Sequence, residues 1–132
     1  ILHQAEESGL VHTTGNYQEP NYYICNCCTC SCGILRSVAE FNNSSAVAKA
    51  DFLVVVDEEL CLACGDCLER CQFKALSIEN NYCVVDPSNC VGCGLCVPEC
   101  PEEALVMVRR PEGEIPQPPS DIKSWGMKRQ SL

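Results

Sequence analysis

The chain has 132 residues, of which 14 are cysteine, and it carries a formal net charge of −9. A cysteine content this high predicts a scaffold held together by disulfides or by metal. The negative charge excludes nucleic acid as a partner, because phosphate binding requires a basic surface. The longest apolar run, residues 52–56, has the length of a strand and is too short to span a membrane.

Acidic residues are concentrated in one part of the chain. Residues 57–103 contain ten Asp and Glu side chains, against only Arg70 and Lys74. Such a surface would steer the protein toward partner proteins with basic docking surfaces, although acid that only maintains solubility gives the same count. We expect a cytoplasmic protein, because no basic region followed by an apolar stretch marks a secretory signal.

The first segment, residues 2–8, has helical character and stops at Gly9. The chain begins with Ile1, which already lies in this helical pattern. We therefore expect it to be part of a longer protein whose upstream domains are missing here.

A dense group of cysteines follows. Five of them fall within eight residues: Cys25, Cys27, Cys28, Cys30 and Cys32. So many soft ligands predict a metal site, either an iron–sulfur cluster or a zinc ion. A redox-active dithiol or disulfide is an alternative, as is ordinary core packing; a bond between adjacent Cys27 and Cys28 would be strained. His3 and His12 are candidate nitrogen ligands, although an isolated histidine is more often a surface or capping residue.

Composition divides the chain into three parts. Residues 1–50 form an N-terminal helical and cysteine-rich segment, with a second helix expected near residues 34–41. Residues 51–109 form a separate domain. Residues 110–132 form a tail that is predicted to be extended, because it is polar and contains four prolines.

Residues 51–109 contain an internal repeat with an offset of 29 residues, so that Val56-Asp57 matches Val85-Asp86. Each copy is expected to contain a strand, a cysteine loop, a short helix and a second strand. The two copies should pair their strands around a pseudo-two-fold axis, since neither has enough apolar area to fold alone.

One hairpin can be placed in this repeat. Residues 82–85 are expected to pair with residues 75–78 and to turn at Asn80-Asn81. Cys83 in this hairpin is predicted to be a small buried hydrophobe, which is the usual setting of a free cysteine.

Both copies carry the cysteine spacing C-x2-C-x2-C-x3-C. The positions are Cys61, Cys64, Cys67 and Cys71 in the first copy, and Cys90, Cys93, Cys96 and Cys100 in the second. Three thiolates on one short loop can reach three irons of a cubane cluster. Zinc sites use four ligands, usually as two separated pairs, and a disulfide framework suits a secreted protein. The spacing therefore favours two [4Fe–4S] clusters.

The two copies resemble a bacterial-type ferredoxin with two [4Fe–4S] clusters, over residues 51–109. Cys100-Pro101 matches the family's closing Cys-Pro, whereas Cys71 is followed by Gln72. The resemblance implies an α+β, ferredoxin-like fold with two hairpins and two short helices. It also implies crossed ligation, in which the fourth cysteine, on the helix after each loop, binds the other cluster. The implied sets are Cys61, Cys64, Cys67 and Cys100 for cluster 1, and Cys90, Cys93, Cys96 and Cys71 for cluster 2.

A second resemblance includes the N-terminal segment. Gly9–His12, Ile24–Cys28 and Leu35-Arg36 are similar to the C-terminal part of longer iron–sulfur proteins of anaerobic microbes. In those proteins a cysteine-rich stretch precedes a two-cluster ferredoxin module. Members tend to have a further cysteine where this chain has Ser31, which leaves the ligand set of the N-terminal site open.

These observations predict low-potential one-electron transfer, by a carrier or by the electron-delivery module of a larger oxidoreductase. Four cysteine ligands at each cluster leave no iron open to a substrate, so no catalytic residue is assigned. Two alternatives place the function at the N-terminal cysteines. They would form either the active centre of a redox enzyme module, as a third cluster or dithiol, or a zinc clip that docks a partner.

Overall fold

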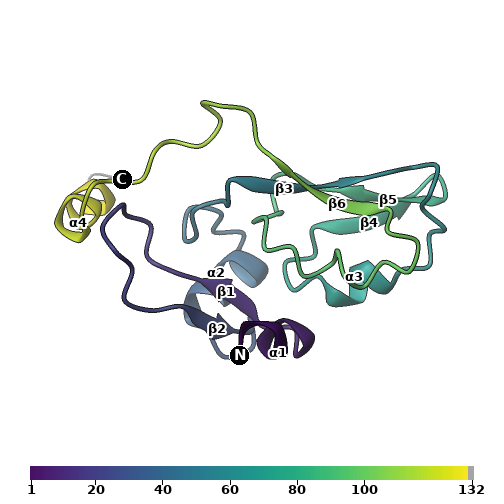
Figure 1. Ribbon diagram of the computed structural model, residues 1–132, viewed down its shortest axis with the longest axis horizontal. Coiled ribbons are helices and arrows are strands. Elements are labelled where there is room, and N and C mark those ends of the chain that lie inside the picture. Colours follow the sequence, from purple (N-terminus) through teal and green to yellow (C-terminus); the bar gives the residue numbers. More distant parts are fainter. Residues whose placement is uncertain (131–132) are drawn as a thin grey trace.

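The computed structural model describes residues 1–130 and shows a small mixed fold of helices and two-stranded antiparallel sheets (Figure 1). The elements are α1 (Leu2–Glu7), β1 (Val11–Thr13), β2 (Cys25–Cys27), α2 (Gly33–Phe41), β3 (Phe52–Val56), α3 (Asp66–Arg70), β4 (Leu76–Glu79), β5 (Tyr82–Val85), β6 (Leu105–Arg109) and α4 (Ile122–Gln130). This mixture of short helices and small antiparallel sheets is consistent with a ferredoxin-like fold. Among the described residues, no helix has both the length and the apolar character needed to cross a membrane.

Two of the sheets build the region of the cysteine repeat. Strand β3 pairs with β6, so the start of the first copy meets the end of the second. Strands β4 and β5 form the predicted hairpin, with Ile78 opposite Cys83. Asn80 and Asn81 both have positive φ, at 50° and 66°, which is the conformation a two-residue hairpin turn requires. The hairpin prediction is confirmed.

Equivalent positions of the two copies adopt the same unusual backbone conformation. Left-handed residues recur at the offset of 29: Ala63 and Gly92, Gly65 and Gly94, Lys74 and Glu103. Two of these pairs lie in the cysteine loops, where a left-handed residue reverses the chain direction within a few residues. Both loops therefore wrap in the same way, although their side chains differ.

The short helix expected in each copy is found only in the first. Helix α3 precedes Cys71, while the equivalent residues 95–99 form turns. In α3 the backbone N–H of Glu69 donates to the carbonyl of Gly65. The equivalent of Glu69 is Pro98, which has no N–H to donate. The prediction of a second helix was therefore wrong, and Cys71 itself lies just outside α3 as its C-terminal cap.

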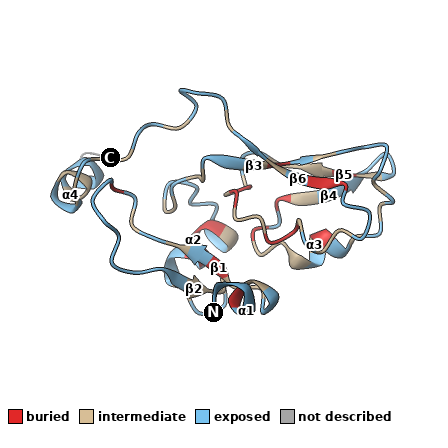
Figure 2. Ribbon diagram, viewed as in Figure 1, coloured by how far each residue is buried: buried red, intermediate tan, exposed pale blue. Residues whose placement is uncertain are grey.

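The N-terminal segment forms the arm of the molecule. Helices α1 and α2 occur where the sequence predicted them, and strands β1 and β2 pair between them. Val11, Leu35 and Val38 from the arm share one buried core with Phe73 and Leu95 from the repeat region. Figure 2 shows buried residues where the arm meets this region. The arm is therefore packed against the cysteine loops and does not extend freely from them.

The C-terminal segment returns to the arm before it forms a helix. The backbone N–H groups of Gln18 and Glu19 donate to the carbonyl oxygens of Pro119 and Ser120. The tail was predicted to be extended, but Ile122–Gln130 form α4, so that prediction was wrong for these residues. The prolines end at residue 119, and the Asp121 carboxylate then accepts a hydrogen bond from the Ser124 N–H at 2.7 Å and starts the helix. Residues 131–132 lie outside the described residues.

Candidate metal centres

The first candidate centre is a cavity beside the β4–β5 hairpin. It is lined by three cysteines of the first copy and the fourth cysteine of the second: Cys61, Cys64, Cys67 and Cys100. Its volume is about 360 Å³, which includes space open to solvent. Cys64 is exposed, and the adjacent Leu62 side chain is 68% exposed. This cavity therefore lies at the surface of the molecule.

The second candidate centre lies where the repeat meets the arm. It is lined by three cysteines of the second copy and the fourth cysteine of the first: Cys90, Cys93, Cys96 and Cys71. Its volume is about 340 Å³, close to that of the first cavity. Phe73 and Leu95 line it too, and both are buried in the core shared with the arm. The structure thus brings the eight predicted cysteines together in two groups of four.

Backbone amides point at the sulfur atoms in these cavities. The N–H of Ala75 donates to Cys71 Sγ at 3.4 Å, and the N–H of Ala104 donates to Cys100 Sγ at 3.3 Å. Ala75 and Ala104 are equivalent positions of the two copies and are 3% and 0% exposed. Amide donors at ligand sulfurs stabilise the negative charge that a cluster gains when it is reduced.

The cysteine side chains lie in surroundings that disfavour a bare thiolate. Burial raises the pKa of the Cys96 thiol to about 12 and also raises the pKa values of Cys67 and Cys93. Free thiolates would be costly in such surroundings, whereas metal coordination deprotonates a thiol and supplies the compensating charge. Four cysteines around a cavity, with amides directed at sulfur, fit a [4Fe–4S] cluster in each case.

Gly92 shows how tightly the second cysteine loop is packed. Its φ is 80°, and a Cβ at this position would collide with the carbonyl oxygen of Phe52 on β3. Because glycine has no Cβ, the loop carrying Cys90, Cys93 and Cys96 can lie directly against the backbone of β3.

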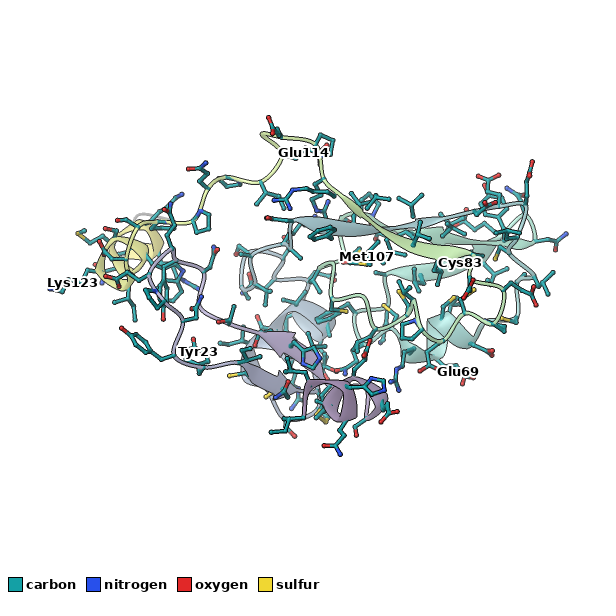
Figure 3. All side chains as sticks on the ribbon, viewed as in Figure 1. Tyr23, Glu69, Cys83, Met107, Glu114 and Lys123 are labelled. Atoms are coloured by element: carbon teal, nitrogen blue, oxygen red, sulfur yellow. A yellow bond between two sulfur atoms is a disulfide. The ribbon has the colours of Figure 1, made fainter. Side chains whose placement is uncertain are left out.

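Cys83 lies in the first cavity in addition to the four predicted ligands. Its side chain is 1% exposed, and its Sγ lies 3.7 Å from Cys67 Sγ. Its backbone N–H donates to Cys61 Sγ at 3.3 Å. Figure 3 shows Cys83 among the strands, on the side facing α3. The prediction of a buried residue is confirmed, but sequence reasoning missed its position among the cluster cysteines.

The five N-terminal cysteines do not share one environment. Cys28 and Cys30 form a disulfide, while Cys25, Cys27 and Cys32 are free. Within residues 1–130, no group of three or more His, Cys, Asp or Glu side chains is arranged to hold a single metal ion. Burial, followed by the neighbouring Cys32 and Cys25, raises the pKa of Cys27, so these three thiols lie near one another. A third metal site stays a prediction.

The two histidines have other partners. His12 lies opposite Asn26 in the β1–β2 pair, and its Nδ1 is 2.5 Å from Asn26 Oδ1. His3 lies on α1 within 3.4 Å of Glu6 and Glu7. Both are exposed, as expected for histidines that act as surface residues.

Gln72 connects the second cavity to the cysteine-rich loop. Its Oε1 accepts a hydrogen bond from the Thr29 N–H at 2.6 Å, and its Nε2 donates to the carbonyl of Gly9. Thr29 stands between Cys28 and Cys30, and Gln72 directly follows Cys71. The sequence showed Gln72 only as a departure from the family's Cys-Pro. A glutamine in place of the family's proline was therefore the one feature of the sequence that pointed to this contact.

Arg70 fixes the end of α1 in the same region. Its guanidinium donates to the carbonyl oxygens of Glu6 and Glu7, and it pairs with Glu99 at 3.2 Å. These carbonyls lie at the C-terminal end of the helix, where a cation is favourable. Three consecutive residues, Arg70 to Gln72, thus join the arm to the second centre.

Comparison with known protein families finds the 4Fe-4S binding domain twice in this chain, over residues 54–77 and residues 83–106. The two matches are separated by the offset of the repeat and contain the eight predicted cysteines. They indicate that this region binds [4Fe–4S] clusters and serves iron–sulfur electron transfer. No match to a curated protein is found for the chain.

Proposed function

We propose that the chain transfers single electrons at low potential through two [4Fe–4S] clusters, as a carrier or as the electron-delivery module of a larger oxidoreductase. Cys61, Cys64, Cys67 and Cys100 would hold cluster 1, and Cys90, Cys93, Cys96 and Cys71 would hold cluster 2. The observation that carries the proposal is the grouping of these cysteines around two cavities, each lined by both copies. When bound, each cluster would supply a site that gains and loses one electron without exposing iron to a substrate.

Charge around the cavities supports a low potential. Ten Asp and Glu side chains lie in residues 57–103, and they disfavour the additional negative charge of a reduced cluster. The amides of Ala75, Cys83 and Ala104 oppose this effect by donating to ligand sulfurs. The balance of these two contributions sets the potential of each cluster.

Electrons would enter or leave at cluster 1. Cys64 and Leu62 are exposed there, and Asp66 and Glu102 add exposed negative charge beside the cavity. An acidic rim around an apolar contact suits a redox partner with a basic docking surface. We propose a reducing, cytoplasmic setting in an anaerobe, which would keep the cluster thiols from oxidation.

The first test of this function is metal content. Chain prepared under anaerobic conditions should contain about eight irons, with matching sulfide and visible absorbance from the clusters. Markedly fewer irons, without that absorbance, would contradict two-cluster binding.

The second test is electron transfer to a basic one-electron acceptor such as cytochrome c. The rate should fall as salt is added, since the docking charges are exposed. Glu102→Lys at the rim of the first cavity should slow transfer more than Glu79→Lys, a matched change at an exposed residue outside the cavity lining. Equal effects of the two variants would contradict docking at cluster 1.

A second candidate function uses the N-terminal cysteines as the place where electrons are delivered. The specific observation in its favour is the Gln72 contact between Cys71 and the cysteine-rich loop. A docking module clipped by zinc at these cysteines, by contrast, has no specific support in the observed arrangement.

A further inference from the structure

The Cys28–Cys30 disulfide differs from every other cysteine position in the chain. The remaining twelve cysteines form no disulfide, and eight of them line the two cluster cavities. Where a protein keeps most of its thiols reduced, a disulfide is typically catalytic or redox-sensing and not structural. Its loop is also short, so it constrains the unfolded chain little. This disulfide therefore calls for a chemical explanation.

The disulfide is accessible and locally supported. Cys30 is exposed and Cys28 is half-buried. The backbone N–H of Cys32 donates to the carbonyl of Cys28 at 3.0 Å, which closes a turn around the pair. Their Cα atoms are 5.2 Å apart, within the usual range for a disulfide. The turn keeps the two sulfurs adjacent, so the bond can break and form again without a large movement.

A short path leads from cluster 2 to this disulfide. Cys71 lines the second cavity, and the next residue, Gln72, accepts the Thr29 N–H at 2.6 Å. Thr29 is bonded to both half-cystines, so only two residues and one hydrogen bond separate Cys71 from Cys28. The flanking cysteines Cys27 and Cys32 pack against the same core as Cys71 and Cys93. The arm thus holds the disulfide beside cluster 2.

We propose that the Cys28–Cys30 disulfide is a redox-active site that accepts two electrons from the two [4Fe–4S] clusters. The S–S bond breaks, two electrons and two protons are taken up, and two thiols form. One electron comes from each reduced cluster, which returns to its oxidised state, and the protons come from solvent at exposed Cys30. A low-potential one-electron donor protein would then reduce the clusters again. The proposal rests on the proposed electron-transfer function.

The number of electrons that a disulfide accepts matches the number that two clusters carry. A disulfide is a two-electron couple, while each cluster carries one electron. One reduced cluster supplies one electron at a time, whereas two reduced clusters in one chain hold both electrons at once. The second cavity is linked to the disulfide through Gln72 and Thr29, and the first cavity lies at the surface, which would give the electrons a direction of travel.

The test follows internal electron transfer in the complete, cluster-loaded chain. Anaerobic protein is mixed rapidly with about two electrons of Ti(III) citrate per chain, and cluster absorbance is recorded. In the native sequence the absorbance should bleach and then recover as electrons pass to the disulfide. In the double variant Cys28→Ser/Cys30→Ser it should bleach and stay bleached. Ser44→Ala, a change at an exposed residue of the same arm, should behave like the native chain.

Gln72→Pro tests the path. It introduces the residue that follows Cys100 in the second copy, removes both side-chain hydrogen bonds and leaves all eight cluster cysteines in place. Recovery of the absorbance should become at least several-fold slower. In the native chain, alkylation and mass spectrometry after recovery should find two additional thiols, at Cys28 and Cys30. An unchanged rate in Gln72→Pro would overturn the path.

Three results would overturn the proposal. The first is a native chain that loads about eight irons but shows no recovery, which leaves the electron-transfer function intact. The second is recovery without new thiols at Cys28 and Cys30. The third is zinc or about twelve irons in the isolated chain, with these cysteines bound to metal. A chain with far fewer than eight irons would instead show that the proposed function itself fails.

Discussion

The two cluster cavities share one backbone design but have different surroundings. At the second cavity, Phe73 and Leu95 are buried against the arm. Their equivalents at the first cavity, 29 residues away in the repeat, are Glu102 and Asp66, which are exposed acids. The repeat therefore fixes where the cysteines lie, while single side chains decide what covers each centre. One cavity is covered by the chain itself, and the other is left open to solvent.

The residues beside the fourth cysteines show the same division. Gln72 follows Cys71 and binds the arm through both ends of its amide. Pro101 follows Cys100, is exposed and lines the first cavity. Arg70 and Glu99, which are also equivalent, pair with each other across the two copies at 3.2 Å. The two copies thus differ in sequence where one cavity faces the arm and the other faces solvent.

The largest expected effect comes from removing a cysteine that one copy supplies to the other copy's cavity. Cys100→Ala should lose one cluster, about four of eight irons, and should melt earlier, because cluster binding and folding are coupled. Combining Cys100→Ala with a second cysteine substitution shows which cluster Cys100 binds. With Cys64→Ala the double variant should still hold about four irons, whereas with Cys93→Ala both clusters should be lost.

Iron and sulfide analysis with thermal melting measures these outcomes. Cys25→Ala is the matched control, since Cys25 lies outside both cavity linings. If Cys64→Ala/Cys100→Ala lost all iron while Cys93→Ala/Cys100→Ala kept half, the ligands would divide by copy and crossed ligation would be wrong.

The next largest effect is expected when a residue that covers the second cavity is replaced by its equivalent at the first cavity. Phe73→Glu places the second copy's acid in the core shared with the arm, where Phe73 is 4% exposed. Losing the ring alone should cost about 3–5 kcal/mol, and an unpaired carboxylate adds to that. Hydrogen exchange should show faster exchange in α2 and β1, with β4 and β5 less affected. Glu102→Ala, at the equivalent exposed position, should leave exchange in the arm unchanged.

Much of this architecture was readable from the sequence, for reasons that individual residues make clear. The cysteine spacing favoured two clusters, the resemblance to two-cluster ferredoxins implied both groups of four, and Asn80-Asn81 marked the hairpin turn. What failed depended on single atoms or on tertiary contacts. Pro98 removes one N–H and with it the second helix. The role of Gln72 requires Thr29 and Gly9 to be adjacent in space, which no local pattern contains.

A smaller effect separates the redox properties of the two cavities. Cys83 occupies the position that Val54 occupies in the first copy, and each lines its own cavity. Cys67 Sγ donates to Cys83 Sγ at 3.7 Å, and burial raises the pKa of the Cys83 thiol to about 12. When Cys67 binds a cluster as a thiolate, the protonated Cys83 would become the donor in this contact. This donation favours the reduced state of cluster 1.

Cys83→Val should therefore lower the midpoint potential of cluster 1 and leave that of cluster 2 unchanged. Val54→Cys is the reciprocal variant and should raise the potential of cluster 2. Redox titration followed by electron paramagnetic resonance measures both, with iron content checked in each variant. Equal shifts of both clusters in Cys83→Val would contradict a local contact at Cys67.

The smallest effect concerns the turns that precede the cysteine loops. Asp86 Oδ1 accepts the Ser88 hydroxyl and the Ser88 N–H, and Oδ2 accepts the Asn89 amide. The hydrogen bond from the Ser88 side chain, with these others, lowers the pKa of Asp86. The equivalent Asp57 accepts only the backbone N–H groups of the Glu59 and Leu60 positions. The side-chain contribution is therefore specific to the second copy.

A lowered pKa in the folded state means that Asp86 stabilises the fold above the pKa of an unfolded aspartate. That contribution is lost as the pH falls through the lower, folded-state value. Ser88→Ala should raise the pKa of Asp86 toward its ordinary value and reduce the acid-side dependence of stability. Glu59→Ala, at the position equivalent to Ser88, keeps the backbone donor to Asp57 and removes no bond of this kind. Melting of the loaded protein across the acidic range should separate the two variants. If Ser88→Ala and Glu59→Ala changed the acid-side dependence of the melting temperature equally, the Ser88 hydroxyl would make no contribution to it.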